Sequence, residues 1–385
     1  MRKFNKLLTE NLSRYTIGLV SIGIVIVFQI LTKGLILRPM NITNLITQNA
    51  HIIILGVGMM LLVKAGGMID LSVGSLSALV GGLCGLWIIK NGMNTYLALF
   101  LVLLVTLAVG AFNAILVAKI QINPFIATMA SQLIIRGLVY SILQGKSFTI
   151  FPDNFITWCT GYISDPFGGE GIHVMTLLIG AALSAVIVLL QLRARKEKKK
   201  YEVEVCSLPL FIMLQVLIVG FVMIISYALA VYKGMPKVLV IVGIIVIVYS
   251  FIISKTVIGR HIIAIGGNRM AAVLSGVKDN RVIFGIYVNN AILAALAGIL
   301  YAARLNGCSC NVGSGFETDA IAVCFIGGGV TNGSIIGAVM GALIIGLLNN
   351  GMAILGIAAD VQMCIKGLVL VAAVTLDIMQ SKKSH

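Results

Sequence analysis

The sequence predicts an all-α integral membrane protein with about ten transmembrane helices, and two observations carry that prediction. Of its 385 residues, 59% are hydrophobic and only 11% are charged, and its mean hydropathy is +1.07. A soluble domain has no core large enough to bury so much apolar surface. Glycine is abundant, with 42 residues against 6 prolines, and small residues let membrane helices pack closely.

A helix needs about 20 apolar residues to cross a bilayer, and ten stretches of roughly this kind follow one another along the chain. They cover residues 15–32, 44–63, 71–89, 96–117, 173–192, 208–231, 237–253, 283–303, 334–352 and 361–378. No small-residue cleavage site follows the first stretch, so we expect a retained helix and not a signal peptide. All ten stretches belong to one transmembrane domain, residues 15–380.

Two further apolar segments, 124–143 and 319–326, are shorter or interrupted. Arg136 breaks the first segment, and Gly clusters lie nearby. Such features are typical of half-helices or re-entrant elements. The helix count is therefore about ten, and eleven or twelve if these segments also cross. Segment 124–143 must cross if the basic stretches of the chain are to lie on one side of the membrane.

The net charge of +15 comes from basic stretches that lie between apolar spans, so it does not indicate nucleic-acid binding. These stretches are the N-terminal segment 1–14, a loop 193–207, a longer loop 254–282 and the tail 381–385. By the positive-inside rule we expect all four to be cytoplasmic. The expected location is a cell (plasma) membrane, surrounded by membrane lipid, with both termini in the cytoplasm.

A transporter needs a source of energy, and the sequence favours a separate partner. Residues 145–147 (GKS) resemble the end of a phosphate-binding loop, but Tyr140 stands where the first Gly is required. Ion coupling has weak support because few ionisable residues lie within the apolar spans. Those residues are Asp70, His51, Arg136, Asp319 and Lys366.

An enzyme embedded in the membrane is not indicated either. The chain has no paired carboxylates, metal-ligand cluster or nucleophile–base pair at a recognisable spacing. Its seven Cys residues are scattered and lack metal-site spacing. We therefore expect no catalytic residues, no metal and no cofactor on this chain.

Residues 67–75, GMIDLSVGS, closely resemble the G-x-I-D-L-S-V-G motif of the ribose/xylose-type (multiple monosaccharide) permeases of binding-protein-dependent ABC importers. Further matches occur in the order of that family. They lie at 123–128 with 136–137, 259–276, 295–304, 319–328 and 348–351. The resemblance runs from about residue 45 to residue 378 and implies a permease subunit, not an enzyme.

The resemblance also implies the partners and the mechanism. Two copies of the permease form the pathway, an extracytoplasmic sugar-binding protein delivers a monosaccharide, and a separate ATPase drives alternating access. Loop 254–282 is similar to the part of the family that docks on the ATPase. Its matching residues are Gly259, Arg260, Gly266, Gly267, Asn268, Ala271, Ala272, Ser275 and Gly276.

The substrate expected from the resemblance is a pentose or hexose such as xylose, ribose, galactose or arabinose. Segment 147–237 is longer than in the shorter ribose-type permeases and is similar to the xylose or multiple-monosaccharide branch. The alternative is an ion-coupled secondary sugar transporter, which would act without an ATPase.

A neutral sugar requires hydrogen-bond donors and acceptors, and an aromatic ring can stack on it. The candidate pathway residues are Asp70, Ser72, Ser75, Asn123, Phe125, Thr128, Asn349 and Asn350. Asp70 has a structural alternative as the N-cap of the following span. The other polar residues also have a structural alternative, in which they form hydrogen bonds between helices. His51 is interpreted as a packed residue.

Overall fold

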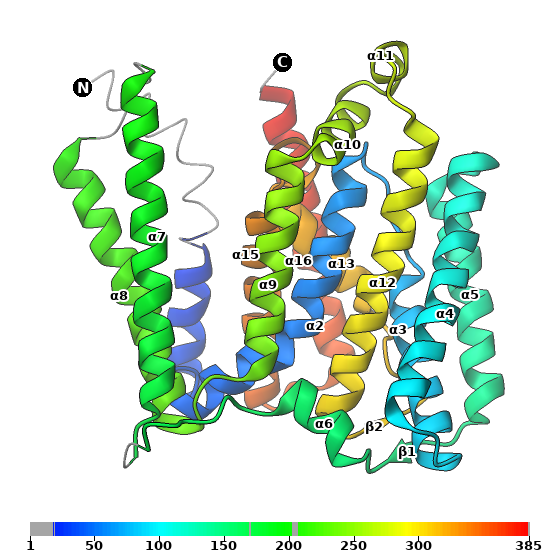
Figure 1. Ribbon diagram of the computed structural model, residues 1–385, viewed down its shortest axis with the longest axis horizontal. Coiled ribbons are helices and arrows are strands. Elements are labelled where there is room, and N and C mark those ends of the chain that lie inside the picture. Colours follow the sequence, from blue (N-terminus) through cyan, green and yellow to red (C-terminus); the bar gives the residue numbers. More distant parts are fainter. Residues whose placement is uncertain (1–17, 19, 169–170, 202–206, 384–385) are drawn as a thin grey trace.

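The computed structural model describes residues 18, 20–168, 171–201 and 207–383, and most of them are helical (Figure 1). Within these residues, nine helices are long and apolar enough to cross a membrane. They are α2 (Pro39–Lys64), α3 with the π-helical η1 (Val73–Cys84 and Gly85–Lys90), α4 with η2 (Thr95–Ala114 and Ile115–Lys119), α5 (Pro124–Leu143), α7 (Val174–Lys200), α8 (Leu208–Tyr232), α9 (Lys237–Lys255), α12 (Asp279–Leu305) and α15 (Ile335–Ile354). The expected all-α membrane fold is confirmed.

Two more helices correspond to the first and last predicted spans. A short apolar helix, Val20–Leu31, precedes α2, and α16 (Ala359–Lys383) closes the chain. Segment 124–143 is the full helix α5. By contrast, 319–326 falls within α13 (Phe316–Ile326), whose 11 residues reach only about 16 Å and cannot cross a bilayer alone. The half-helix interpretation therefore applies to α13 and not to α5.

Short elements mark the two ends of the bundle (Figure 1). At one end, called the α6 end, lie α6 (Asp153–Thr160) and the antiparallel strands β1 (Phe148–Thr149) and β2 (Gly307–Cys308). At the opposite end, called the α10–α11 end, lie α10 (Val257–Gly267) and α11 (Arg269–Leu274). The four-residue helix α14 (Gly329–Asn332) joins α13 to α15.

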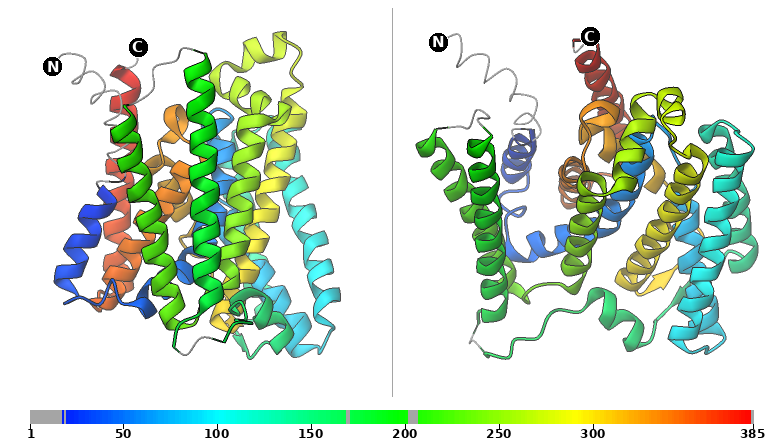
Figure 2. Two further views of the ribbon diagram at one scale, coloured as in Figure 1. Left: turned by 60° about the vertical axis from the view of Figure 1, so that its left-hand side comes forward. Right: turned by 45° about the horizontal axis from the view of Figure 1, so that its top comes forward.

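The core is formed around α2, which packs against α12, α13 and α15. In α2 and α3 about four-fifths of the central apolar window is buried (83% and 78%), whereas in α8 only 6% is buried. The hairpin of α7 and α8 accordingly stands at the edge of the bundle (Figure 2). Since the exposed side chains of α8, and of α7 before its basic last turns, are mostly apolar, this edge is suited to lipid or to another membrane protein.

Two expected loops differ from the structure. Residues 193–200 of the expected loop 193–207 continue α7 to Lys200, because Lys and Arg are good helix formers and are favoured at helix C-termini. Loop 254–282 is largely helical, since it contains α10 and α11. Segment 1–14, residues 202–206 and residues 384–385 lie outside the described residues, and 381–383 end α16.

Candidate functional site

The first candidate site is the junction between α2 and α3, residues 65–72, which contains the first six residues of the GMIDLSVGS motif. Gly66 and Gly67 have positive φ angles of 110° and 73°, which other residues rarely adopt, and here the chain leaves α2. The junction then leads to Asp70, which is only 2% exposed.

The Asp70 carboxylate accepts three hydrogen bonds. Its Oδ1 accepts from the backbone N–H of Ser72 (2.9 Å) and from the Ser72 hydroxyl (2.6 Å), and its Oδ2 accepts from the Asn290 amide on α12 (2.9 Å). The Asn113 amide of α4 in turn donates to the Ser72 hydroxyl (2.8 Å). Asp70 is not itself the N-cap, since Ser72 occupies that position, but its carboxylate does bind a backbone N–H at the start of α3.

The junction also forms a hydrogen bond with α5 and a second one with α12. The Leu71 N–H donates to the Thr128 hydroxyl (3.1 Å), which donates to the Pro124 carbonyl within α5 (2.8 Å). The Tyr287 hydroxyl donates to the Ile69 carbonyl (3.2 Å). Asp70, Ser72 and Thr128 therefore lie together in one buried network that joins α3, α4, α5 and α12.

The remaining predicted pathway residues are dispersed. Ser75 is buried on α3, and its hydroxyl has no hydrogen-bond partner among the residues that the structure describes. Asn123 caps α5 by accepting from the Phe125 N–H (3.0 Å), while the Phe125 side chain is 50% exposed. Asn350 exchanges two hydrogen bonds with Asn41 (2.9 and 3.1 Å). Asn349 lines a cavity on the other side of α2.

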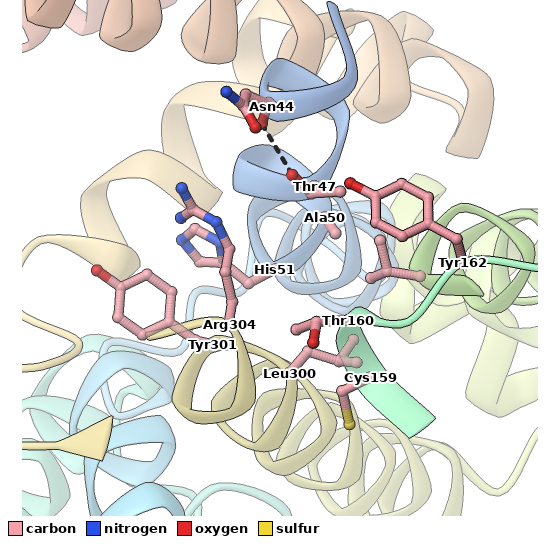
Figure 3. Close-up of a pocket in the computed structure, with 11 residues that line it drawn as sticks. Asn44, Thr47, Ala50, His51, Cys159, Thr160, Tyr162, Leu300, Tyr301 and Arg304 are labelled. Atoms are coloured by element: carbon pink, nitrogen blue, oxygen red, sulfur yellow. Dashed lines mark hydrogen bonds between the residues drawn. The ribbon is translucent and has the colours of Figure 1, made fainter. Parts of the chain in front are cut away.

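Two cavities, with volumes of about 250 and 210 Å³, share His51, Tyr301 and Arg304 in their walls. The first reaches the α6 end, and its other lining residues are Asn44, Thr47, Ala50, Cys159, Thr160, Tyr162, Val238 and Leu300 (Figure 3). The second is lined in addition by Gln48, Asn49, Ile52, Ser314, Phe316, Asp319, Asn349, Ala353, Gln362 and Lys366. We call the two together the double cavity.

Three rings gather in the double cavity. The His51 ring lies 4.8 Å from that of Tyr301 and 4.5 Å from that of Phe316, and the Tyr301 and Phe316 rings are 5.0 Å apart. The Arg304 side chain lies beside the His51 ring (Figure 3). Among the described residues, Arg304 finds no hydrogen-bond or ion-pair partner, whereas Lys366 is paired with Asp319 at 3.0 Å.

The double cavity was not predicted from the sequence. Asn349 is its sole member among the predicted pathway residues. His51, Asp319 and Lys366 were considered as candidates for ion coupling, and His51 was interpreted as a packed residue. A signal did exist in α2, because Asn44, Thr47 and His51 recur at intervals of three and four residues. That spacing places polar side chains on one face of an otherwise apolar helix.

The second candidate site is the α10–α11 end. Apolar side chains are exposed on both short helices, and we call them the α10–α11 face: Val257, Ile258, Ile263, Met270, Val273 and Leu274. Leu274 is 82% exposed. Asn268 caps α11 by accepting from the Ala271 N–H (3.0 Å), and Arg269 forms an ion pair with Asp279 at 2.8 Å. Exposed apolar groups on rigid, capped helices are typical of a docking surface.

The matching residues of this loop divide into buried and exposed sets. Gly259 lies against the Ile252 and Ile253 carbonyls of α9, and Gly266 lies against the Lys64 carbonyl at the end of α2. Ala272 is buried, whereas Gly267 and Arg260 are exposed. Ser275 and Gly276 end α11, with Gly276 at a φ of 89°. The loop is thus packed onto α2 and α9 on one side and open on the other.

Known proteins are similar to this chain along nearly its whole length. Residues 41–374 match the family model described as "Branched-chain amino acid transport system / permease component". The xylose transport system permease protein of Haemophilus influenzae is 32% identical over 98% of this chain and 99% of its own. The ribose import permease proteins of Escherichia coli and Bacillus subtilis are 31% and 30% identical, over 88% and 93% of this chain and 85% and 90% of their own. No solved structure matches significantly.

Proposed function

Since the chain belongs to the family of permease components of branched-chain amino acid transport systems, we propose that it is the membrane subunit of an ABC importer for a monosaccharide. The family description names amino acids, but the similar full-length relatives are named for xylose and ribose. A pentose or a hexose is therefore the substrate class that we assign. No part of this proposal requires a cofactor on the chain itself.

The observation that carries the proposal is the arrangement of the α10–α11 face relative to α2. On its outer side this face is exposed and apolar, which suits an ATPase subunit. On its inner side α10 packs on Lys64, the last residue of α2. Helix α2 also contains His51, which lines both parts of the double cavity. A force applied by an ATPase to α10 therefore has a direct mechanical route to a cavity inside the bundle.

Alternating access then follows from differential binding. ATP binding by the partner favours one conformation of the permease only if the docked surfaces fit that conformation better. A shift of α10 moves the end of α2 and, through residues 65–72, the buried Asp70 network that joins α3, α4, α5 and α12. The coupling residues are Gly259, Arg260, Gly266, Gly267, Asn268, Ala271, Ala272, Ser275 and Gly276.

We place the α10–α11 end in the cytoplasm of a bacterial cell. The basic C-terminal turns of α7, and Lys255, Arg260 and Arg281, belong to this end, as the positive-inside rule requires. The termini are then cytoplasmic, and the α6 end faces the extracytoplasmic binding protein. The apolar edge formed by α7 and α8 faces lipid, and a second copy of the chain completes the pathway.

The proposal is tested by extracting the tagged, full-length chain from native membranes in a mild detergent and identifying the proteins recovered with it by mass. We expect an ATPase that carries a phosphate-binding loop. Recovery without an ATPase, together with sugar uptake into vesicles that follows an ion gradient and not ATP, would instead support a secondary transporter.

A further inference from the structure

Two residues that line the double cavity, Asn49 and Asn349, carry buried polar atoms that have no partner among the described residues. The Oδ1 atoms of Asn49 and Asn349 are both inaccessible and accept no hydrogen bond, and the Asn49 residue is 1% exposed. A buried acceptor left unsatisfied is costly, so such groups are usually explained by a ligand or water that the site is built to hold. Two such acceptors, on residues of α2 and α15 that line one cavity, favour a ligand whose groups donate hydrogen bonds to these amides once they turn toward the cavity.

The double cavity also offers a donor. Arg304, at the last turn of α12, borders both cavities and has no partner among the described residues. Its guanidinium carries five N–H donors in a rigid plane, which can bind two neighbouring oxygen atoms at once. Acceptors on one wall and an unpaired guanidinium on another match the hydroxyl groups of a polyol, each of which both donates and accepts.

The rings and the charges narrow the ligand class further. The cluster of His51, Tyr301 and Phe316 presents ring faces and edges of the kind on which the C–H groups of a sugar ring pack. A free amino acid would need an anionic partner for its ammonium group, but Lys366 already pairs with Asp319. No other acidic residue lines the double cavity within the described chain. A neutral ligand requires no such partner.

We propose that the double cavity is a binding site for a neutral monosaccharide, in which Asn49 and Asn349 accept hydrogen bonds from sugar hydroxyl groups and Arg304 donates to sugar oxygens. The assignment rests on the proposed function and names the residues through which the permease itself contacts its substrate. Selection of the sugar is then shared between the binding protein and this site, which α2 connects to the α10–α11 face.

The test measures binding of tritiated D-xylose, D-ribose, L-arabinose and D-galactose to the purified full-length chain in lipid nanodiscs. Unlabelled L-leucine and D-galacturonate serve as competitors. The variants are Arg304→Gln and Asn349→Ala. The matched control is Asn311→Ala, because Asn311 is exposed, accepts one hydrogen bond from Tyr140 and borders neither cavity. Thermal unfolding of each variant checks its fold.

We expect at least one of the four sugars to bind to the wild-type chain. Arg304→Gln should weaken that binding roughly tenfold or more, and Asn349→Ala roughly threefold to tenfold, since hydrogen bonds to charged groups are the stronger ones. Asn311→Ala should bind as the wild type does. If Asn349→Ala does not fold, the result for Arg304→Gln decides the test, because Arg304 has no hydrogen bond to lose within the described part of the chain.

Three results would overturn the assignment: no binding of any of the four sugars, sugar binding that neither variant alters, or preferential binding of leucine or galacturonate. Failure here differs from failure of the proposed function. An ATPase recovered with a chain that binds no sugar would refute the site alone. A chain that binds sugar through Arg304 but recovers no ATPase would refute the ABC importer alone.

Discussion

Gly266 of α10 lies against the backbone carbonyl of Lys64, the last residue of α2, so closely that a methyl group on Gly266 would overlap the oxygen. The same methyl group would lie 3.2 Å from the backbone nitrogen of Gly66. Backbone atoms cannot move aside as the end of a flexible side chain can. Position 266 therefore requires glycine, and this contact is the place where the loop after α9 meets the α2–α3 junction.

Replacing Gly266 with alanine should separate α10 from α2. Overpacking of this kind costs about 1–3 kcal/mol, and the chain relieves it by moving α10. We expect Gly266→Ala to reduce ATP-driven sugar uptake severalfold while the partner ATPase continues to hydrolyse ATP. Uptake and hydrolysis are measured together in vesicles that contain the complete complex.

Gly285→Ala is the matched control for that experiment. Gly285 lies within α12, is exposed, and has open space where its Cβ would be, so the substitution tests the general effect of adding a methyl group to a helix. It should leave uptake unchanged. Equal loss of uptake in the two variants, or wild-type uptake in Gly266→Ala, would show that the contact with Lys64 does not transmit the coupling.

Asp70 should contribute strongly to stability. Asp70→Ala removes the acceptor of three hydrogen bonds and leaves the buried amide of Asn290 without its partner. Bonds to a charged group contribute about 1.5–3 kcal/mol each, so we expect a loss of about 3 kcal/mol or more. Unfolding of the purified chain by a denaturing detergent, monitored by circular dichroism, measures it.

Ser75→Ala provides the contrast, because the Ser75 hydroxyl is buried on the same helix but forms no hydrogen bond. Its removal should change the free energy of unfolding by about 0.5 kcal/mol or less. If Asp70→Ala were as stable as Ser75→Ala, the Asp70 network would not hold the junction together, and direct contact of Asp70 with the substrate would become the better explanation for its place in the motif.

The spans could be predicted from the sequence because lipid imposes a simple rule on composition and length. Apolar runs therefore located all the long helices, including α5, whose Arg136 satisfies its charge by donating to the carbonyls of Cys310 and Val312. Periodicity did not indicate how these helices associate. The Asp70–Asn290 hydrogen bond joins residues 220 positions apart, and no local sequence pattern predicts such a pair.

The double cavity was missed for a related reason. Its walls come from α2, α6, α9, α12, α13, α15, α16 and two loops. Most of its polar side chains occur singly in apolar helices, where a structural role is the usual interpretation. The motifs of the family directed attention to Asp70 and Thr128, which the structure places in a helix-to-helix network. Contact between the predicted pathway residues and the substrate stays a prediction.

The ion pair of Asp319 and Lys366 should show strong coupling between its two members. The Asp319 side chain is 7% exposed and that of Lys366 is 25% exposed, so removing one partner leaves the other charge poorly solvated. Each of Lys366→Met and Asp319→Asn should destabilise the chain by about 3 kcal/mol, and the double variant by less than the sum. Additive losses in a double-mutant cycle of unfolding would contradict this expectation.

The α10–α11 face should govern recovery of the ATPase. Leu274 is 82% exposed and Met270 is 70% exposed, so a carboxylate at either position meets water in the free chain and costs little stability. In the complex the same carboxylate would be buried against a partner without a compensating charge. We expect Leu274→Asp and Met270→Asp to reduce the ATPase recovered from membranes at least tenfold, with unfolding of the chain itself unchanged.

Phe167→Asp is the control for this last pair, because Phe167 is also exposed, at 63%, but lies in the loop between α6 and α7 at the opposite end of the bundle. Recovery of the ATPase should be normal in that variant. Loss of the ATPase from Phe167→Asp but not from Leu274→Asp would place the docking surface at the α6 end. The proposed orientation of the chain in the membrane would then have to be reversed.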